Sequence, residues 1–244
     1  MKVDVLGIGF DDIDLDRAVS QAIESIQNRD EKAYVVTPNP EIAWMARRDE
    51  TLRNALNGAS LVLPDGIGII MVARILGTPL RCGRVPGIDF AAALLQEMAQ
   101  CGISIFLLGA KPGIAERAAL MLGEKYPGLK TAGEADGYFT DDDPIIERIN
   151  AAQPDVLFVC LGAGKQEIWI SENLKRLDVR LCAGLGGCID VFAGNAKRAP
   201  VFFQKLGLEW LYRLFREPRR IKRMIKLPLF VLVLIWKRLF GNRG

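Results

Sequence analysis

The 244-residue chain contains no histidine. This absence excludes Ser-His-Asp and Cys-His catalysis and any zinc site with histidine ligands. A general base must therefore be an aspartate, glutamate, lysine or tyrosine. Cysteine is also scarce, with five residues and no CxxC pair. The odd number argues against a disulfide framework, and three of the five lie in or beside apolar runs, so we expect reduced thiols in the core.

Long apolar runs are missing as well. No stretch approaches the roughly 18 consecutive apolar residues of a membrane-spanning helix. The first residues, MKVDVLGIGF, alternate like a strand and include Asp4, which is unlike a secretory signal. We therefore expect a cytoplasmic protein. Half of the residues are hydrophobic, which suffices for a large core in one domain.

Charge is distributed unevenly along the chain. Residues 197–244 contain 13 of the 32 basic residues and 2 of the 29 acidic ones, a net charge of +11. Residues 1–196 are correspondingly acidic, with a net charge of −8. A basic tail on an acidic body indicates a polyanion, an anionic membrane surface or a phosphorylated ligand as partner.

Apolar strand-like runs alternate with amphipathic helical patterns along residues 1–196. The predicted strands are KVDVLGIGF, AYVVTPN, SLVLPDG, SIFLLGA, DVLFVCLGAG and VRLCAGLGG. Nearly continuous Val, Leu, Ile and Phe between helices is typical of a parallel sheet covered on both faces. The sequence thus predicts an α/β, Rossmann-like domain over residues 1–196, followed by a basic amphipathic helical appendage over residues 197–244.

Most of these strands end in glycine, asparagine or aspartate. In open α/β sheets, ligands bind beyond the carboxyl ends of the strands. We therefore expect one cleft at the corners that follow five apolar residues: Val36, Leu63, Leu108, Leu161 and Leu185.

Two of these corners carry polar residues suited to catalysis. Asp65 in LPDG is positioned to act as a base, with Gly66 permitting close approach of the backbone. Thr37 and Asn39 flank Pro38 and are suited to bind sugar hydroxyls. For each motif the alternative is a helix N-cap or a turn.

Glycine-rich loops follow three further strands. Gly109 opens GAKPG, whose backbone N–H groups can hold an anion or a uracil carbonyl. Gln166 in GAGKQE offers donors and an acceptor for a base or sugar, and Gly186 and Asp190 lie in GLGGCID. The alternatives are simple strand–helix turns and, for Asp190, a cap. The acidic run 141–143 precedes Pro144, and we interpret it as a capping cluster, not a metal site.

Arginines provide the candidate phosphate ligands. Arg84 in RCGRVPGID is suited to a bidentate contact with a diphosphate, although a surface arginine is the ordinary interpretation. In the tail, arginines recur at helical spacing. The ten-residue run LPLFVLVLIW has basic flanks and would rise roughly 15 Å as a helix, which suits burial at the headgroup boundary of a membrane. Without a membrane, an apolar tail can bury itself between subunits, so a homo-oligomer is a further possibility.

Taken in order, the segments TPNPE, LPDGIGI, RVPGID, LGAKPG, GAGKQE, GLGGCIDVFAG, KRAP and GLEWLYRLFREPRR resemble the WecG/TagA/CpsF family of bacterial glycosyltransferases over nearly the whole chain. The resemblance is strongest to members acting in wall teichoic acid synthesis. It implies transfer of N-acetylmannosamine from UDP-ManNAc to the 4-hydroxyl of GlcNAc on undecaprenyl-diphosphate-GlcNAc. It further implies inversion at the anomeric carbon, no metal or other cofactor, and docking on the inner face of the cell membrane through the tail.

The resemblance also implies roles for individual residues. Asp65 matches the family's catalytic base, and Thr37 and Asn39 match its sugar-binding residues. The implied substrate-binding residues are Arg84, Gln166 and the tail arginines that reach the UDP diphosphate: Arg213, Arg220 and Arg223.

Two alternatives stay open at this point. The first keeps the family and changes the donor to UDP-ManNAcA or UDP-glucose, for antigen or capsular glycans. The second is a non-enzymatic nucleotide- or nucleic-acid-binding protein with a basic arm. The tail charge supports the second alternative, whereas the apolar run and the acidic body favour a membrane-associated enzyme without nucleic acid.

Overall fold

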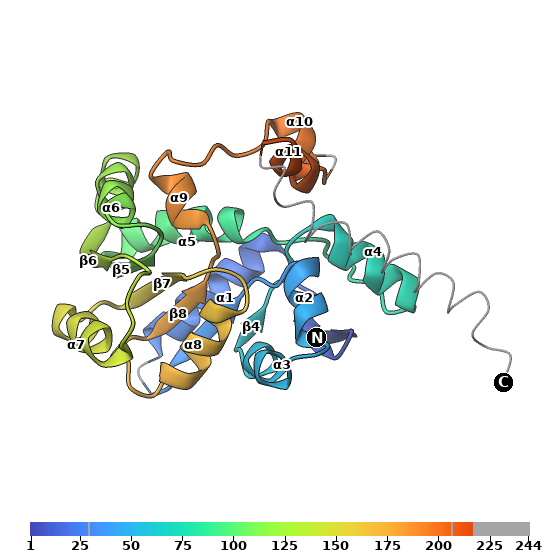
Figure 1. Ribbon diagram of the computed structural model, residues 1–244, viewed down its shortest axis with the longest axis horizontal. Helices are drawn as coiled ribbons and strands as arrows, with labels where there is room; N and C mark the ends of the chain where they lie inside the picture. The colour runs from blue at the N-terminus through green and yellow to red at the C-terminus, as the bar shows by residue number, and fades with distance from the viewer. Residues whose placement is uncertain (29, 206, 217–244) are drawn as a thin grey trace, which may run out of the picture.

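The computed structural model describes residues 1–28, 30–205 and 207–216. Six parallel strands form the main sheet, in the spatial order β4-β3-β8-β7-β5-β6. The α/β, Rossmann-like prediction is therefore confirmed (Figure 1). The strands, in that order, are β4 (Leu61–Val62), β3 (Ala33–Val36), β8 (Leu181–Gly184), β7 (Val156–Cys160), β5 (Ser104–Gly109) and β6 (Lys130–Ala135).

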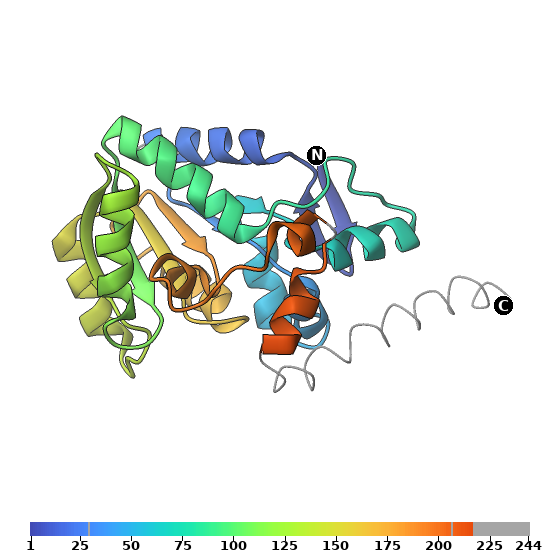
Figure 2. The same cartoon turned by 90° about the horizontal axis from the view of Figure 1, so that it is seen from above.

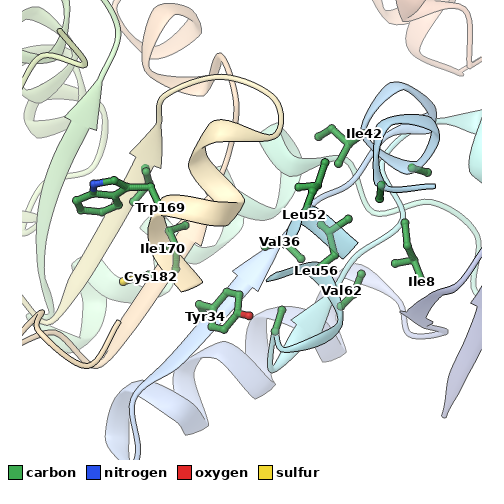
Figure 3. Packing of buried hydrophobic residues seen from close by; sticks show 14 of the residues in the cluster. Ile8, Tyr34, Val36, Ile42, Leu52, Leu56, Val62, Trp169, Ile170 and Cys182 are labelled. Carbon is green, nitrogen blue, oxygen red and sulfur yellow. The ribbon is translucent and has the colours of Figure 1, made fainter. Parts of the chain in front are cut away.

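Helices cover both faces of the sheet. Successive strand residues point to opposite sides, so the central strands contribute to a buried cluster on each face. Val35 belongs to one buried cluster and Val36 to the other. The Val35 cluster includes helices α1 (Leu15–Gln27), α5 (Gly87–Cys101), α6 (Ile114–Lys125) and α9 (Cys188–Phe192). The Val36 cluster, shown in part in Figure 3, includes α2 (Pro40–Ala46), α3 (Glu50–Asn57), α4 (Ile67–Leu76), α7 (Asp142–Ala152) and α8 (Lys165–Asn173).

The N-terminal run forms a hairpin instead of joining the parallel sheet. Strands β1 (Lys2–Val5) and β2 (Ile8–Asp11) pair antiparallel. The chain reverses at Leu6 and Gly7, whose φ angles of 64° and 83° suit a two-residue hairpin turn. The Asp11 carboxylate then accepts a hydrogen bond of 2.9 Å from Val62 N. The hairpin thus braces the edge strand that leads to Asp65.

Strand β6 has no counterpart among the predicted strands. Its sequence KTAGEA has little apolar content, because it lies at the sheet edge and is largely accessible to solvent. Edge strands need less hydrophobic surface than central ones, so the apolar-run criterion misses them.

The first part of the predicted appendage folds back onto the α/β body. It forms α10 (Val201–Lys205) and α11 (Glu209–Arg216), drawn in orange-red in Figures 1 and 2. A Cβ atom on Gly207 would lie 2.9 Å from Ile67 Cβ, so this turn packs closely against the start of α4. Arg220, Arg223 and the LPLFVLVLIW run lie outside the described residues. Within the described ranges, no helix has the length and apolar character that crossing a bilayer requires.

Candidate active site

Neighbouring strands send the chain to opposite faces of the sheet at the edge where a ligand site is expected. After β3 the chain enters α2 on one face, and after the adjacent β8 it enters α9 on the other. Such a divergence opens a crevice at the carboxyl edge of a parallel sheet. Thr37 stands at this point, 6% exposed, and its Oγ1 donates a 3.1 Å hydrogen bond to Gly184 O. Thr37 therefore ties the two strand ends together.

Asn39 caps α2, as the capping alternative predicted. Its Oδ1 accepts hydrogen bonds from Glu41 N at 2.9 Å and Ile42 N at 3.1 Å. Both bonds use the oxygen, and no described residue accepts from the Asn39 Nδ2 group. The side chain is half-buried, so capping leaves its amide nitrogen for a ligand.

Asp65 follows β4 but does not cap the helix that comes directly after it. The N-cap of α4 is Gly66, with φ of 95°, a conformation that glycine adopts readily. The turn directs the Asp65 carboxylate toward a different helix, where Oδ2 accepts from Gly87 N at 3.4 Å. Gly87 begins α5. The carboxylate thus lies at a helix N-terminus, which stabilises negative charge.

Gly87 is enclosed between Asp65 and Thr37. A Cβ atom at this position would lie 2.8 Å from Thr37 Oγ1 and 3.3 Å from Thr37 Cβ. These distances are shorter than ordinary contacts, so the first turn of α5 fits here only without a side chain. The structure therefore brings the two predicted catalytic corners together through the start of α5.

A cluster of four charged side chains lies beside this corner. Arg198 forms a bidentate pair with Asp89, with nitrogen–oxygen distances of 2.6 and 2.8 Å. Its Nη2 also lies 3.8 Å from Glu209 Oε1, and Arg84 Nη1 lies 3.3 Å from the same oxygen. Arg84 donates its second bond to the Gln204 carbonyl. We call these four residues, Arg84, Asp89, Arg198 and Glu209, the arginine–carboxylate cluster.

Carboxylates surround Arg198 in this cluster. Burial by itself lowers its pKa, but the hydrogen bonds that Arg198 donates to Asp89 and the charges of Asp89, Glu209 and Asp65 raise the pKa above its ordinary value. The negative charge of Asp65 contributes to this rise, so the cluster lies within electrostatic reach of Asp65.

Gln166 lies between two glycine-rich loops. It is 1% exposed, its Oε1 accepts from Gly186 N at 3.0 Å, and its Nε2 donates to Glu167 Oε1 at 2.9 Å. Glu167 is fully buried and accepts from Gly164 N at 2.8 Å. Burial raises the pKa of the Glu167 carboxyl, while these hydrogen bonds lower it less. The pair thus fixes the loops after β7 and β8 relative to each other.

Gly109 and Asp190 also have structural partners. A Cβ on Gly109 would lie 2.3 Å from Cys160 O, so the glycine is needed for close approach of β5 and β7. Asp190 lies in the first turn of α9, whose N-cap is Gly187, and its Oδ1 accepts from Asn195 Nδ2 at 2.9 Å. Gly186, in contrast, has φ of 58° and open space where a Cβ would lie.

One residue of the acidic run caps a helix, as the capping interpretation predicted, whereas the next one accepts hydrogen bonds from α8. Asp141 is the N-cap of α7 and accepts from Asp143 N at 3.0 Å. Asp142 accepts from Trp169 Nε1 at 2.9 Å and from Asn173. Over the described ranges, no group of three or more His, Cys, Asp or Glu residues is arranged to hold a metal ion.

Sequence reasoning assigned no role to Asp89, Arg198 or Glu209. Their signal was present, because they lie in the segments RVPGID, KRAP and GLEW. What the sequence does not show is that Arg198 and Asp89, 109 positions apart, meet at this edge. Among the tail arginines, Arg213 lies in α11, and the other two predicted ligands lie beyond residue 216.

Comparison with known proteins places this site in context. Residues 3–244 match the Glycosyl transferase WecG/TagA/CpsF family. Proteins from Bacillus spizizenii, Bacillus subtilis and Staphylococcus aureus are 36%, 38% and 33% identical to the chain. These alignments cover 92%, 83% and 94% of this chain, and 87%, 79% and 91% of the respective relatives. All three relatives are named N-acetylglucosaminyldiphosphoundecaprenol N-acetyl-beta-D-mannosaminyltransferase.

Proposed function

Because the chain belongs to the WecG/TagA/CpsF family of glycosyl transferases, we propose that it transfers N-acetylmannosamine to GlcNAc on diphosphoundecaprenol. The chain is an enzyme, a hexosyltransferase, as its relatives are. The proposed donor is UDP-ManNAc, and the proposed pathway is formation of the wall teichoic acid linkage unit. Family membership favours this reading over a non-enzymatic nucleic-acid-binding protein.

The position of Asp65 is the observation that carries the mechanism. The acceptor hydroxyl must lose a proton as its oxygen attacks the anomeric carbon of the donor sugar. Asp65 is a carboxylate at the carboxyl edge of the sheet, held by Gly87 N at the start of α5. In a chain without histidine, this carboxylate is suited to accept the proton. Attack from the acceptor side breaks the bond to UDP on the other side, so the configuration inverts.

The neighbouring corner is proposed to hold the sugars. Asn39 keeps its Nδ2 group for a sugar oxygen while its Oδ1 caps α2. Thr37 donates its hydroxyl hydrogen to Gly184 O, so its oxygen can only accept a further bond from a sugar hydroxyl. This one corner therefore supplies a donor, Asn39 Nδ2, and an acceptor, Thr37 Oγ1, as recognition of a sugar requires.

The leaving UDP gains negative charge in the transition state. We assign its diphosphate to the tail arginines Arg213, Arg220 and Arg223, and its nucleoside to the loops that contain Gly109, Gln166, Gly186 and Asp190. Fixed cationic donors can stabilise developing phosphate charge without a metal. Because Gln166 is buried against Gly186 N, it would act on the nucleotide through that loop.

A lipid-linked acceptor requires the enzyme to work at a membrane surface. We propose that the basic tail docks on anionic lipid at the inner face of the cell membrane, with the apolar run at the headgroup boundary. Release from the membrane can then expose the tail to self-association. Sedimentation with anionic liposomes, compared for the full chain and a chain that ends at residue 196, tests this docking.

The Asp65→Asn variant tests the catalytic assignment. Asparagine keeps the shape and an oxygen for Gly87 N but cannot take up the proton. Turnover should fall by on the order of 10²–10⁴-fold, the usual contribution of a general base, while UDP binding in calorimetry stays unchanged. Asp49→Asn is the matched control, because Asp49 caps α3 and asparagine caps equally well. Undiminished turnover of the Asp65 variant would remove Asp65 from the mechanism.

The donor is tested separately. Purified enzyme and the GlcNAc-diphospholipid acceptor are incubated with UDP-ManNAc, UDP-ManNAcA and UDP-glucose in parallel. Product from UDP-ManNAc alone supports the proposal. Product from one of the other two instead would retain the family mechanism and replace the donor.

A further inference from the structure

The arginine–carboxylate cluster connects three separate parts of the chain. Arg84 lies in the loop between α4 and α5, and Asp89 lies in the first turn of α5. Arg198 precedes α10, and Glu209 begins α11. These side chains are only partly accessible, with exposed fractions of 22% for Arg84, 32% for Asp89, 27% for Arg198 and 13% for Glu209. Ion pairs with this degree of burial are screened less by solvent and salt than surface pairs.

Glu209 is shared by the two arginines. Its Oε1 lies 3.3 Å from Arg84 Nη1 and 3.8 Å from Arg198 Nη2. Arg84 also donates to the Gln204 carbonyl at the end of α10, and the Gln204 side chain donates in turn to Ala199 O at 2.6 Å. The appendage is thus fixed at both of its described helices by the same guanidinium group.

Arg198 connects the appendage to the first turn of α5, which contacts Asp65. Its two terminal nitrogens hold both oxygens of Asp89, two residues after Gly87, whose N–H binds Asp65. Arg198 Nε is buried and has no acceptor among the described residues. The orientation of the guanidinium is therefore set by Asp89 and Glu209, so that the first turn of α5 and the start of α11 are held by one rigid planar group.

We propose that Glu209, Arg84 and Arg198 are positioning residues for the transfer reaction. They clamp residues 197–216 onto the first turn of α5, and the clamp holds that turn in register with Asp65. In this arrangement Arg84 acts on the reaction through Glu209 and not as a ligand of the donor diphosphate. The inference rests on the proposed function for its kinetic part and on the structure alone for the docking of the appendage.

A double-mutant cycle separates a clamp from a diphosphate ligand. The variants are Arg84→Gln, Glu209→Gln and the double variant. If the two side chains act through one another, each single change removes the Arg84–Glu209 interaction, so the loss in the double variant should be smaller than the product of the two single losses. We expect a loss in kcat/KM of up to on the order of 10²-fold in each, since misplacement by about 1 Å costs this much. The loss should fall mainly on kcat.

Amide hydrogen exchange provides a readout independent of catalysis. Glu209→Gln should raise the exchange of residues 199–212 and of the first turn of α5, while β3, β7 and β8 stay protected as evidence of an intact fold. Glu50→Gln is the matched control, because the ion pair that Glu50 forms among the described residues is an exposed 4.0 Å pair with Arg53. This control should leave exchange and turnover unchanged.

Three results would overturn the proposal. The first is multiplicative loss in the double variant, which would show that Arg84 and Glu209 act independently. The second is weaker UDP binding by Arg84→Gln but not by Glu209→Gln, which would make Arg84 a diphosphate ligand. The third is unchanged exchange of residues 199–212 in Glu209→Gln, which removes the clamp itself. If the wild-type enzyme transferred no sugar at all, the proposed function would fail, but the exchange comparison would still test the clamp.

Discussion

The Gly87→Ala variant tests how the proposed catalytic residues Thr37 and Asp65 are held together at the start of α5. Gly87 does not adopt a positive φ angle, so alanine meets no backbone strain there. The added methyl group would lie 2.8 Å from Thr37 Oγ1, and also 3.3 Å from Thr37 Cβ and 3.4 Å from Thr37 Cγ2. Thr37 cannot rotate away without losing its hydrogen bond to Gly184 O. The first turn of α5 must therefore move.

This movement has a cost that can be estimated. Inserting a methyl group into a well-packed site usually destabilises a protein by about 1–3 kcal/mol. For a chain of this size, 1 kcal/mol corresponds to a melting temperature shift of roughly 2–4 °C. The Gly87 N to Asp65 Oδ2 distance is already 3.4 Å, so outward movement of the turn breaks this bond. Activity should accordingly fall by more than the loss of folded protein explains.

The measurement compares calorimetric melting and initial transfer rates for Gly87→Ala, Thr37→Ala and the double variant. Thr37→Ala removes the obstructing Oγ1 and Cγ2 atoms and keeps Cβ, so the double variant should be less destabilised than the sum of the single ones. Gly123→Ala is the control: Gly123 lies in α6 with no atom within 4 Å of an added Cβ, and alanine should be neutral or stabilising by about 0.5–1 kcal/mol. A Gly87→Ala protein with wild-type melting and turnover would refute this account of the corner.

Three further predictions follow from individual contacts. Asn39→Ala removes the cap of α2 and should lower the unfolding free energy, measured with urea, by about 1 kcal/mol. Asn39→Asp keeps the cap but lacks Nδ2, so loss of turnover in this stable variant would indicate a sugar contact through Nδ2. Because burial raises the pKa of Glu167, the contribution of this carboxyl to stability is fully present below its ordinary pKa of 4.5 and is lost as the pH rises through the pKa of the folded state. The unfolding free energy of wild type relative to Glu167→Gln should therefore decrease with rising pH. A difference that stays constant would contradict this prediction. Iodoacetamide should label only the exposed Cys82 and Cys101 in the native protein, because the other three thiols are buried. Mass spectrometry can identify the labelled cysteines. Labelling of all five without unfolding would contradict the burial of these three thiols in the core.

The sequence was sufficient to predict the parallel sheet and the meeting of its polar corners. Central strands such as β5 and β7 are continuous apolar runs, and parallel strands place their carboxyl ends at one edge. Thr37 and Asp65 follow from this rule alone. The rule says nothing of strands that lie outside the main sheet or at its edge, which is why the hairpin at Leu6 and the polar strand β6 differ from the prediction.

The partners of the site residues were harder to predict because they are distant in sequence. The helix directly after Asp65 was the natural candidate for capping, yet Gly66 turns the chain and the carboxylate meets α5, 22 residues on. Arg84 and Glu209 are 125 positions apart, so no local spacing reveals their pairing. Charge pairs carry no periodic signal, whereas a buried apolar face does.

The central position of β8 determines when the site can form. This strand lies between β3 and β7, although it is the last in sequence among the strands of the described residues. Until Leu181–Gly184 are synthesised, β3 and β7 lack the strand that pairs with both of them. Pairing across such sequence distances is slow, because the closing loop must be ordered first. The Thr37 to Gly184 bond therefore cannot form before β8 is synthesised, and a nascent chain that stops before β8 lacks the bond that ties the ends of β3 and β8 together.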